Sequence, residues 1–190
     1  MKRGFILILV TLLVMAATPV IAQEKPATQL EQFTAKKGEI LVKEFYDIGG
    51  ILGEYGASME ITALVLYEPG ATKRLYGLKI YIEESGDYPD TDTSFLDFEE
   101  LISLSKALSY MIELSKKWAL MEKEYTEVLF QTEGDYKIGF FQDGLAQSAF
   151  SESGRVGSAS ILLGIVDLKI AKELIDKGIA KLESLGAGQK

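Results

Sequence analysis

The chain of 190 residues contains no cysteine, no histidine and no asparagine. Without cysteine it forms no disulfide, no thiolate zinc site and no thiol nucleophile. Without histidine it has no imidazole base near neutral pH and no Ser-His-Asp triad. Without asparagine it has no acceptor for N-glycosylation. Any chemistry would rest on Asp, Glu, Ser, Thr, Tyr, Lys or Arg, and these residue types alone do not decide whether the protein is an enzyme.

Positive charge is also scarce, since 20 Lys and Arg stand against 28 Asp and Glu for a net charge of −8. Only Arg3, Arg74 and Arg155 are arginines, and no basic stripe interleaved with aromatic residues occurs. An acidic surface repels phosphate backbones and anionic lipid headgroups. We therefore expect no nucleic-acid partner and no stable membrane association of the mature chain.

The first residues have the three zones of an export signal. Lys2 and Arg3 precede an apolar run, residues 5–15, and small residues follow up to Ala22. This pattern predicts a signal peptide, residues 1–22, with cleavage after Ala22 and a periplasmic or extracellular product. The alternative is a retained membrane anchor, because the uncharged stretch that ends at Ala22 approaches the length that spans a bilayer.

The rest of the chain predicts a single α+β domain, residues 38–185, preceded by a polar linker, residues 23–37, and followed by a disordered tail, residues 186–190. Alternating apolar and polar residues predict an antiparallel sheet of about six to seven strands with two amphipathic helices on one face. The predicted strands are residues 39–46, 59–67, 73–83, 125–132, 136–142, 145–152 and 158–163.

Two helices follow from capping signals and from apolar residues at helical spacing. Asp97 and Glu100 form a capping pair for a helix that runs to about Trp118, and a second helix begins at Asp167. The order strands, helix, strands, helix suggests a tandem repeat with halves of about 38–118 and 124–185. The predicted buried positions are Phe98, Leu101, Leu104, Leu108, Met111 and Ile112 in the first helix, and Leu168, Ala171, Ile175, Gly178, Leu182 and Leu185 in the second.

An acidic loop, residues 87–94, is the first candidate for a binding site, because hard cations take oxygen ligands. With Asp90 as the first position of an EF-hand, Phe95 stands where glycine is required and Leu101 where glutamate is required. The EF-hand pattern therefore fails. We interpret residues 85–94 as a solvated loop and assign no metal ligand.

Two further motifs resemble a catalytic or phosphate-binding site, but the residues around them do not fit such a site. Ser103 and Lys106 have the S-x-x-K spacing of a serine nucleophile beside a lysine, but the companion motifs are absent and Ser103 lies inside a helix. The glycines Gly49, Gly50, Gly53 and Gly56 lack the lysine and the following helix of a phosphate loop, so they predict a bulge or bend.

A run of small residues, 144–160, would let another surface approach a strand closely. We expect the second helix to pack there; the alternatives are a second subunit or a flat apolar ligand. Paired carboxylates could run glycoside hydrolysis without histidine, with Trp118 and tyrosines as sugar platforms. We assign no catalytic or cofactor-binding residue and expect no cofactor. The expected function is a non-catalytic exported protein that binds a small apolar ligand or a protein partner; the alternative is a carboxylate-dependent hydrolase such as a glycoside hydrolase.

Overall fold

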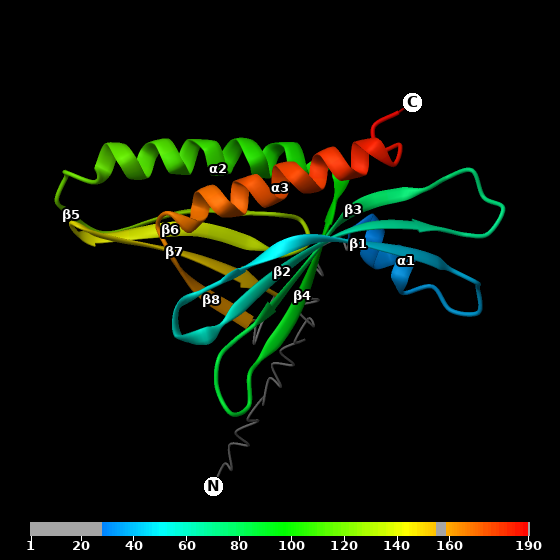
Figure 1. Ribbon diagram of the computed structural model, residues 1–190, viewed down its shortest axis with the longest axis horizontal. Coiled ribbons are helices and arrows are strands. Elements are labelled where there is room, and N and C mark those ends of the chain that lie inside the picture. Colours follow the sequence, from blue (N-terminus) through cyan, green and yellow to red (C-terminus); the bar gives the residue numbers. More distant parts are fainter. Residues whose placement is uncertain (1–27, 155–158, 190) are drawn as a thin grey trace, which may run out of the picture.

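The computed structural model of the chain describes residues 28–154 and 159–189, and the expected signal peptide lies outside the described residues. Eight strands, three α-helices and one short 3-10 helix make up this part (Figure 1). In chain order they are α1 (Gln29–Thr34), β1 (Val42–Leu52), η1 (Glu54–Gly56), β2 (Ser58–Tyr67), β3 (Leu75–Glu83), β4 (Thr91–Asp97), α2 (Phe98–Trp118), β5 (Lys123–Gln131), β6 (Lys137–Gly144), β7 (Ala146–Ser153), β8 (Ala159–Gly164) and α3 (Asp167–Ser184).

The strands form two antiparallel sheets of four strands each, so the α+β class is confirmed. Sheet A contains β1 to β4 and sheet B contains β5 to β8, with neighbouring strands in chain order. The prediction of one sheet of six to seven strands is not confirmed. The helix α2 separates β4 from β5, and each group of four strands pairs only within itself among the described residues.

The strand β4 was not predicted, because its sequence is polar and overlaps the expected loop of residues 85–94. It pairs with β3 in a register that places Ser94 opposite Ile80 and Leu96 opposite Leu78. Ser94 and Leu96 are buried, whereas Thr91 at the start of the strand is exposed. Pairing with a buried neighbour therefore makes a strand here that periodicity alone does not indicate.

The predicted bulge lies in β1. The register against β2 shifts between Asp47 and Gly49, and Gly49 adopts a positive φ of 136°. The strand continues through the bulge to Leu52, so β1 is longer than predicted. Gly53 then brings the backbone against sheet B, since a Cβ at this position would lie 2.7 Å from the carbonyl oxygen of Leu162.

Each of the two long helices lies over the sheet of the other half. Figure 1 shows α2, which follows sheet A, running over β5 to β7, and α3, which follows sheet B, running over β1 and β2. The ring of Trp118 at the end of α2 meets Phe140 of β6 edge-on at 5.7 Å. From α3, Lys177 donates to the carbonyl oxygen of Ile48 in β1, and Gly178 lies against Leu78 in β3. Each sheet is thus covered largely by the helix of the other half.

The helical stripes agree closely with the expected ones. In α2, Leu101, Leu104, Leu108 and Met111 are buried, with Phe98 and Ile112 partly buried. In α3 the first five predicted positions are buried and Ile179 joins them. Beyond α3, Ala187 is buried and donates its N–H to the carbonyl oxygen of Leu182, and residues 185–188 form turns.

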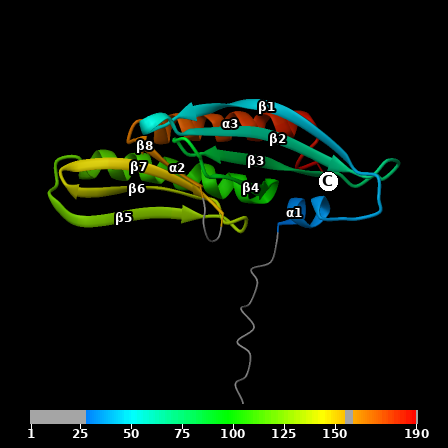
Figure 2. The ribbon, with the colours of Figure 1, turned by 90° about the horizontal axis from the view of Figure 1, so that it is seen from below.

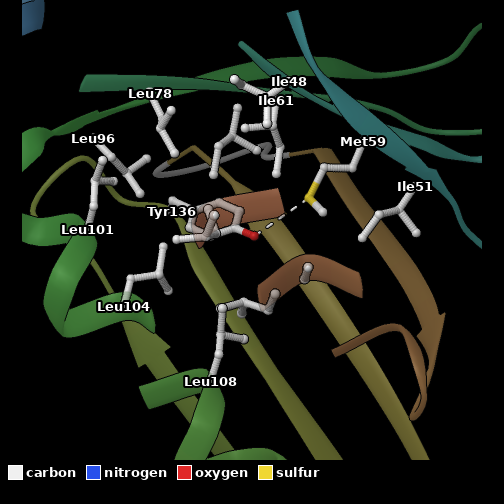
Figure 3. Close-up of a cluster of buried hydrophobic side chains, with 14 of the residues drawn as sticks. Ile48, Ile51, Met59, Ile61, Leu78, Leu96, Leu101, Leu104, Leu108 and Tyr136 are labelled. Atoms are coloured by element: carbon white, nitrogen blue, oxygen red, sulfur yellow. Dashed lines mark hydrogen bonds between the residues drawn. The ribbon is translucent and has the colours of Figure 1, made fainter. Parts of the chain in front are cut away.

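One core joins both sheets and both helices (Figure 3). At its centre the fully buried Tyr136, which precedes β6, points its hydroxyl at Met59 of β2. Three small residues of β7, Ala149, Ser151 and Ser153, are buried in this core, where β3 and β4 of sheet A pack against the strand. Ser151 donates to the sulfur of Met59, and the hydroxyls of Ser94 and Ser153 meet at 2.7 Å. The second helix α3 contacts β8, which begins within the run of small residues, whereas β3 and β4 pack against β7.

Candidate functional site

The acidic loop of the sequence does not form a cluster of ligands. Asp92 lies in β4, where its carboxylate accepts the N–H of Thr93 at 2.7 Å. Asp87 and Asp90 are exposed in the turn before it. Among the described residues, no group of three or more Asp or Glu side chains converges as a metal site would require. Loop residues whose side chains point into solvent offer a cation no preformed cage.

The other sequence candidates are also dispersed. Ser103 and Lys106 are exposed on α2, and the structure gives no hydrogen bond between them in the part of the chain it describes. Trp118 is half-buried, with Lys123 Nζ 4.1 Å from its ring centroid, so its ring is no open sugar platform. The small residues of β7 are used in the contact between the sheets. None of these features builds a reactive site.

Two predicted capping residues lie in a cleft of about 470 Å³ at the start of α2, here called the acidic cleft. Both oxygens of Asp97 accept backbone N–H groups from α1, those of Gln29 at 2.7 Å and Leu30 at 3.1 Å. Glu100 accepts the N–H groups of Asp97 at 3.1 Å and Glu133 at 2.6 Å. The two carboxylates therefore tie the start of α1, the start of α2 and the turn before β6 to one another. The full lining is Gln29, Asp97, Glu99, Glu100, Ser103, Phe130, Gln131, Thr132 and Glu133.

Burial raises the pKa of Asp97 and of Glu100 above their ordinary values, and the backbone hydrogen bonds oppose this shift. A raised carboxyl pKa in a cleft is a mark of acid–base sites as well as of structural carboxylates. Here all four oxygens already accept backbone donors, which is the arrangement of a structural joint. The sequence indicated both residues as caps, and their link to α1 could not be seen without the fold.

A second cleft, of about 280 Å³, lies where the end of α2 meets the start of α3 and the first residues of β7. We call it the helix-end cleft. Its walls are mainly apolar and include Ile112, Ile165 and Val166, the last with 72% of its surface exposed. The full lining is Ile112, Ser115, Lys116, Ala119, Gln147, Ile165, Val166 and Lys169. An apolar hollow with few polar groups is the usual form of a small-ligand site.

The helix-end cleft is held in shape by two buried or half-buried amides. Gln147 donates to the carbonyl oxygen of Ser115 at 3.0 Å and to the side-chain oxygen of Gln142 at 2.8 Å. Gln142 in turn donates to the carbonyl oxygens of Met121 and Gly144. These bonds fasten the end of α2 to the hairpin between β6 and β7. The walls are therefore fixed before any ligand arrives, which lowers the entropic cost of binding.

The opposite wall is fixed at the start of α3. The carboxylate of Asp167 accepts the N–H of Gly164 at 2.9 Å, and the N–H of Lys169 donates to the carbonyl oxygen of Val166 at 3.1 Å. These contacts set the conformation of the short link that carries Ile165 and Val166. Asp167 was predicted as a helix start, and α3 begins at this residue, although its side chain bonds the end of β8 and does not cap the helix.

The only ionisable residues that line the helix-end cleft are two lysines. Lys116 is exposed on the last turn of α2, and Lys169 is exposed on the first turn of α3, 3.6 Å from Glu173. In a chain with net charge −8, an apolar hollow whose ionisable lining residues are both lysines is a local exception. Sequence patterning did not find this site, because its residues come from three elements that only the crossing of the helices brings together.

Comparisons with protein-family models, with curated proteins and with solved structures found no match. Within residues 28–154 and 159–189, no helix combines the length and the apolar character needed to cross a membrane.

Proposed function

We propose that the protein is an exported, non-catalytic binding protein. Its helix-end cleft takes the apolar chain of a small molecule that carries a negatively charged head group. The single observation that carries the proposal is the apolar lining of this cleft with Lys116 and Lys169 at its border. Removal of apolar surface from water favours entry of the chain. The two ammonium groups favour a carboxylate, sulfate or phosphate head group over a neutral or cationic one.

The size of the cleft limits what it takes. Its volume of about 280 Å³ lies just below the range of ligand pockets, which run from about 300 to 1,000 Å³. A longer chain would not fit inside this volume and would extend into solvent. The expected ligand is therefore a short or medium acyl chain, or the end of a longer one.

Titration of the protein with decanoate, decanol and decylamine tests the proposal. The emission of Trp118, the only tryptophan, reports the end of α2, and calorimetry gives the affinities. We expect saturable binding of decanoate, weaker binding of decanol and none of decylamine. Tighter binding of decylamine, or no binding of any of the three, would refute the proposed ligand class.

Matched variants locate the site. Replacing both Lys116 and Lys169 with glutamine should weaken decanoate binding by about tenfold, equivalent to about 1.4 kcal/mol. Ala119→Phe should block binding by filling the cleft. Lys117→Gln is the control, because it removes an exposed cation of the same helix turn that does not line the cleft. Equal losses of decanoate affinity in the control and in the double variant would mean that the overall charge of the protein causes the effect, and not the cleft.

A carboxylate-dependent hydrolase remains the second candidate, because the acidic cleft holds two carboxyl groups with raised pKa values. Such an enzyme would use Asp97 and Glu100 as its acid and base. Screening glycosides with the parent and with Glu100→Gln tests it. Turnover that the substitution abolishes, in a variant that stays folded, would replace the binding proposal.

A further inference from the structure

The outer face of sheet B, turned away from the helices, carries a row of aromatic rings. Tyr125 of β5 stacks on Phe141 of β6 with ring centroids 5.8 Å apart, and Phe141 meets Phe150 of β7 at 6.4 Å. Leu129 and Leu162 extend the row to the two edges of the sheet, since Leu129 and Phe150 both pair with Gly139, and Phe150 pairs with Leu162. We call these five residues the aromatic face.

The aromatic face is open to solvent. Tyr125 is 63% exposed and Leu129 is 47% exposed. A groove of about 250 Å³ lies along Tyr125, Phe141 and Phe150. Figure 2 views the sheets from below, with the helices α2 and α3 behind them, and no described helix or strand lies over β5, β6 and β7 on this side. Phe141 and Phe150 are partly exposed beside Tyr125, and a contiguous apolar patch on one face of a sheet is typical of an interaction site.

The corresponding face of sheet A is covered by α1. Leu30 and Phe33 of this helix pack with Leu66 of β2 and with Leu75 and Phe95, and they form a small separate core. They cover the end of sheet A near the turn between β2 and β3. By the order of the strands, the matching end of sheet B is near the turn between β6 and β7, where Tyr125 and Phe141 lie.

The second half has no helix equivalent to α1 among its described elements. Only residues 119–122 connect α2 to β5, which is too short a link for a helix with two covering side chains. In the repeated architecture, the aromatic face is therefore the position at which a covering helix is missing.

The charge of this region favours one kind of occupant. Glu127 and Glu152 border the groove. Within the described residues only Glu152 of these two forms an ion pair, with Lys137 at 2.9 Å, and Glu127 accepts the hydroxyl of Tyr125 at 3.1 Å. A second copy of the same face would bring Glu127 near its own counterpart and cause repulsion. A cationic partner instead gains from the carboxylates and from the faces of the aromatic rings.

We propose that the aromatic face docks an amphipathic helix of a partner protein that bears lysine or arginine on its polar side. The apolar side of that helix covers Tyr125, Phe141 and Phe150 as α1 covers sheet A. Its cations lie near Glu127. This site is on the opposite side of sheet B from α2, so it is independent of the helix-end cleft and of the ligand proposed for it.

Two synthetic helical peptides of equal length test the inference, one with leucine and lysine and one with leucine and glutamate at the same positions. Calorimetry measures binding, and backbone NMR shifts locate it. We expect the lysine peptide to bind with shifts confined to the four strands of sheet B, β5 to β8. Binding of both peptides with equal affinity, or shifts outside these strands, would overturn the proposal.

Variants separate the aromatic rings from general acidity. Tyr125→Ser and Phe141→Ser should each weaken the lysine peptide by roughly tenfold or more, as expected for central aromatic contacts. Glu127→Lys should weaken it as well. Phe45→Ser is the control, because Phe45 is 58% exposed on β1 of the other sheet. Thermal melts confirm that each variant is folded, and Tyr125→Ser, at the most exposed ring of the row, carries the test if Phe141→Ser unfolds.

Sedimentation of the protein alone completes the test. A monomer at micromolar concentration agrees with the proposal. A dimer that Tyr125→Ser dissociates would overturn it and make a second copy of the chain the occupant.

Discussion

The hydroxyl of Tyr136 donates to the thioether sulfur of Met59 over 3.5 Å, and this contact joins the two sheets at the centre of the core. Both residues are buried, and Ser151 donates to the same sulfur at 3.6 Å. A thioether is a weak acceptor, so the contact stabilises mainly through the packing of the ring. Burial also raises the pKa of Tyr136 far above its ordinary value.

Tyr136→Phe should therefore cost less than about 1 kcal/mol, because it removes a hydroxyl whose partner is weak and keeps the ring. Tyr136→Ala should cost about 3 to 5 kcal/mol, because it leaves a cavity between the sheets. Urea unfolding of the two variants measures both values. A loss in Tyr136→Phe as large as that in Tyr136→Ala would mean that the hydrogen bond outweighs the packing.

Replacing Ile175 with Asp should destabilise the protein by several kcal/mol, roughly the cost of burying an unpaired charge. Ile175 lies on the buried side of α3, with 2% of its surface exposed, and belongs to the core shared by both sheets. Ala180→Asp is the control, since Ala180 is exposed on the same helix. Thermal unfolding compares the two variants, and equal stability would show that the apolar side of α3 is not buried.

Gly53→Ala should cost about 1 to 3 kcal/mol through overpacking between the sheets. A Cβ at this position would lie 2.3 Å from Ile161 Cγ1 and 2.7 Å from the carbonyl oxygen of Leu162, and backbone atoms do not move aside cheaply. Glu54→Ala, exposed in the next position, is the control. Chemical unfolding of both variants checks the expectation, which fails if Gly53→Ala matches the parent.

The acidic cleft predicts a specific dependence of stability on pH. Because burial raises the pKa of Asp97 and Glu100, the folded protein holds their protons more tightly than the unfolded chain does. Their contribution to stability therefore increases as the pH falls through the raised pKa values, down to the ordinary values of 3.8 and 4.5.

Glu100→Gln removes one of these titrating groups. The difference in unfolding free energy between parent and variant should therefore shift toward the parent as the pH falls from 7 to about 4.5. Urea unfolding at both pH values measures the shift, and Glu99→Gln controls for loss of charge near the start of α2. A difference that does not change with pH would contradict the raised pKa of Glu100.

Processing of the first residues is the fifth prediction. The charged, apolar and small-residue zones before Gln23 predict cleavage after Ala22. The intact mass of protein recovered from the exported fraction of producing cells decides it. A mass that retains residues 1–22, found in the membrane fraction, would indicate an anchor.

Local patterns predicted the helices well, because their apolar stripes, the capping pair of Asp97 and Glu100 and the start of α3 at Asp167 are properties of neighbouring residues. They did not predict β4, whose polar residues become a strand only when β3 pairs with them. The division into two sheets depends on which strands meet after α2, and this is a long-range property. For the same reason neither the helix-end cleft nor the aromatic face was predicted: both combine residues from three or more separate elements.

Because α2 covers sheet B and α3 covers sheet A, the two halves of the chain depend on each other for their folding. Such an exchange is the geometry expected when two copies of a strand-and-helix unit swap their helices as a dimer and later become joined in one chain. A chain opened within residues 119–122 would leave each sheet without the helix that largely covers it. The two fragments should therefore be poorly structured alone and regain the fold when mixed, as in complementation between separately made pieces.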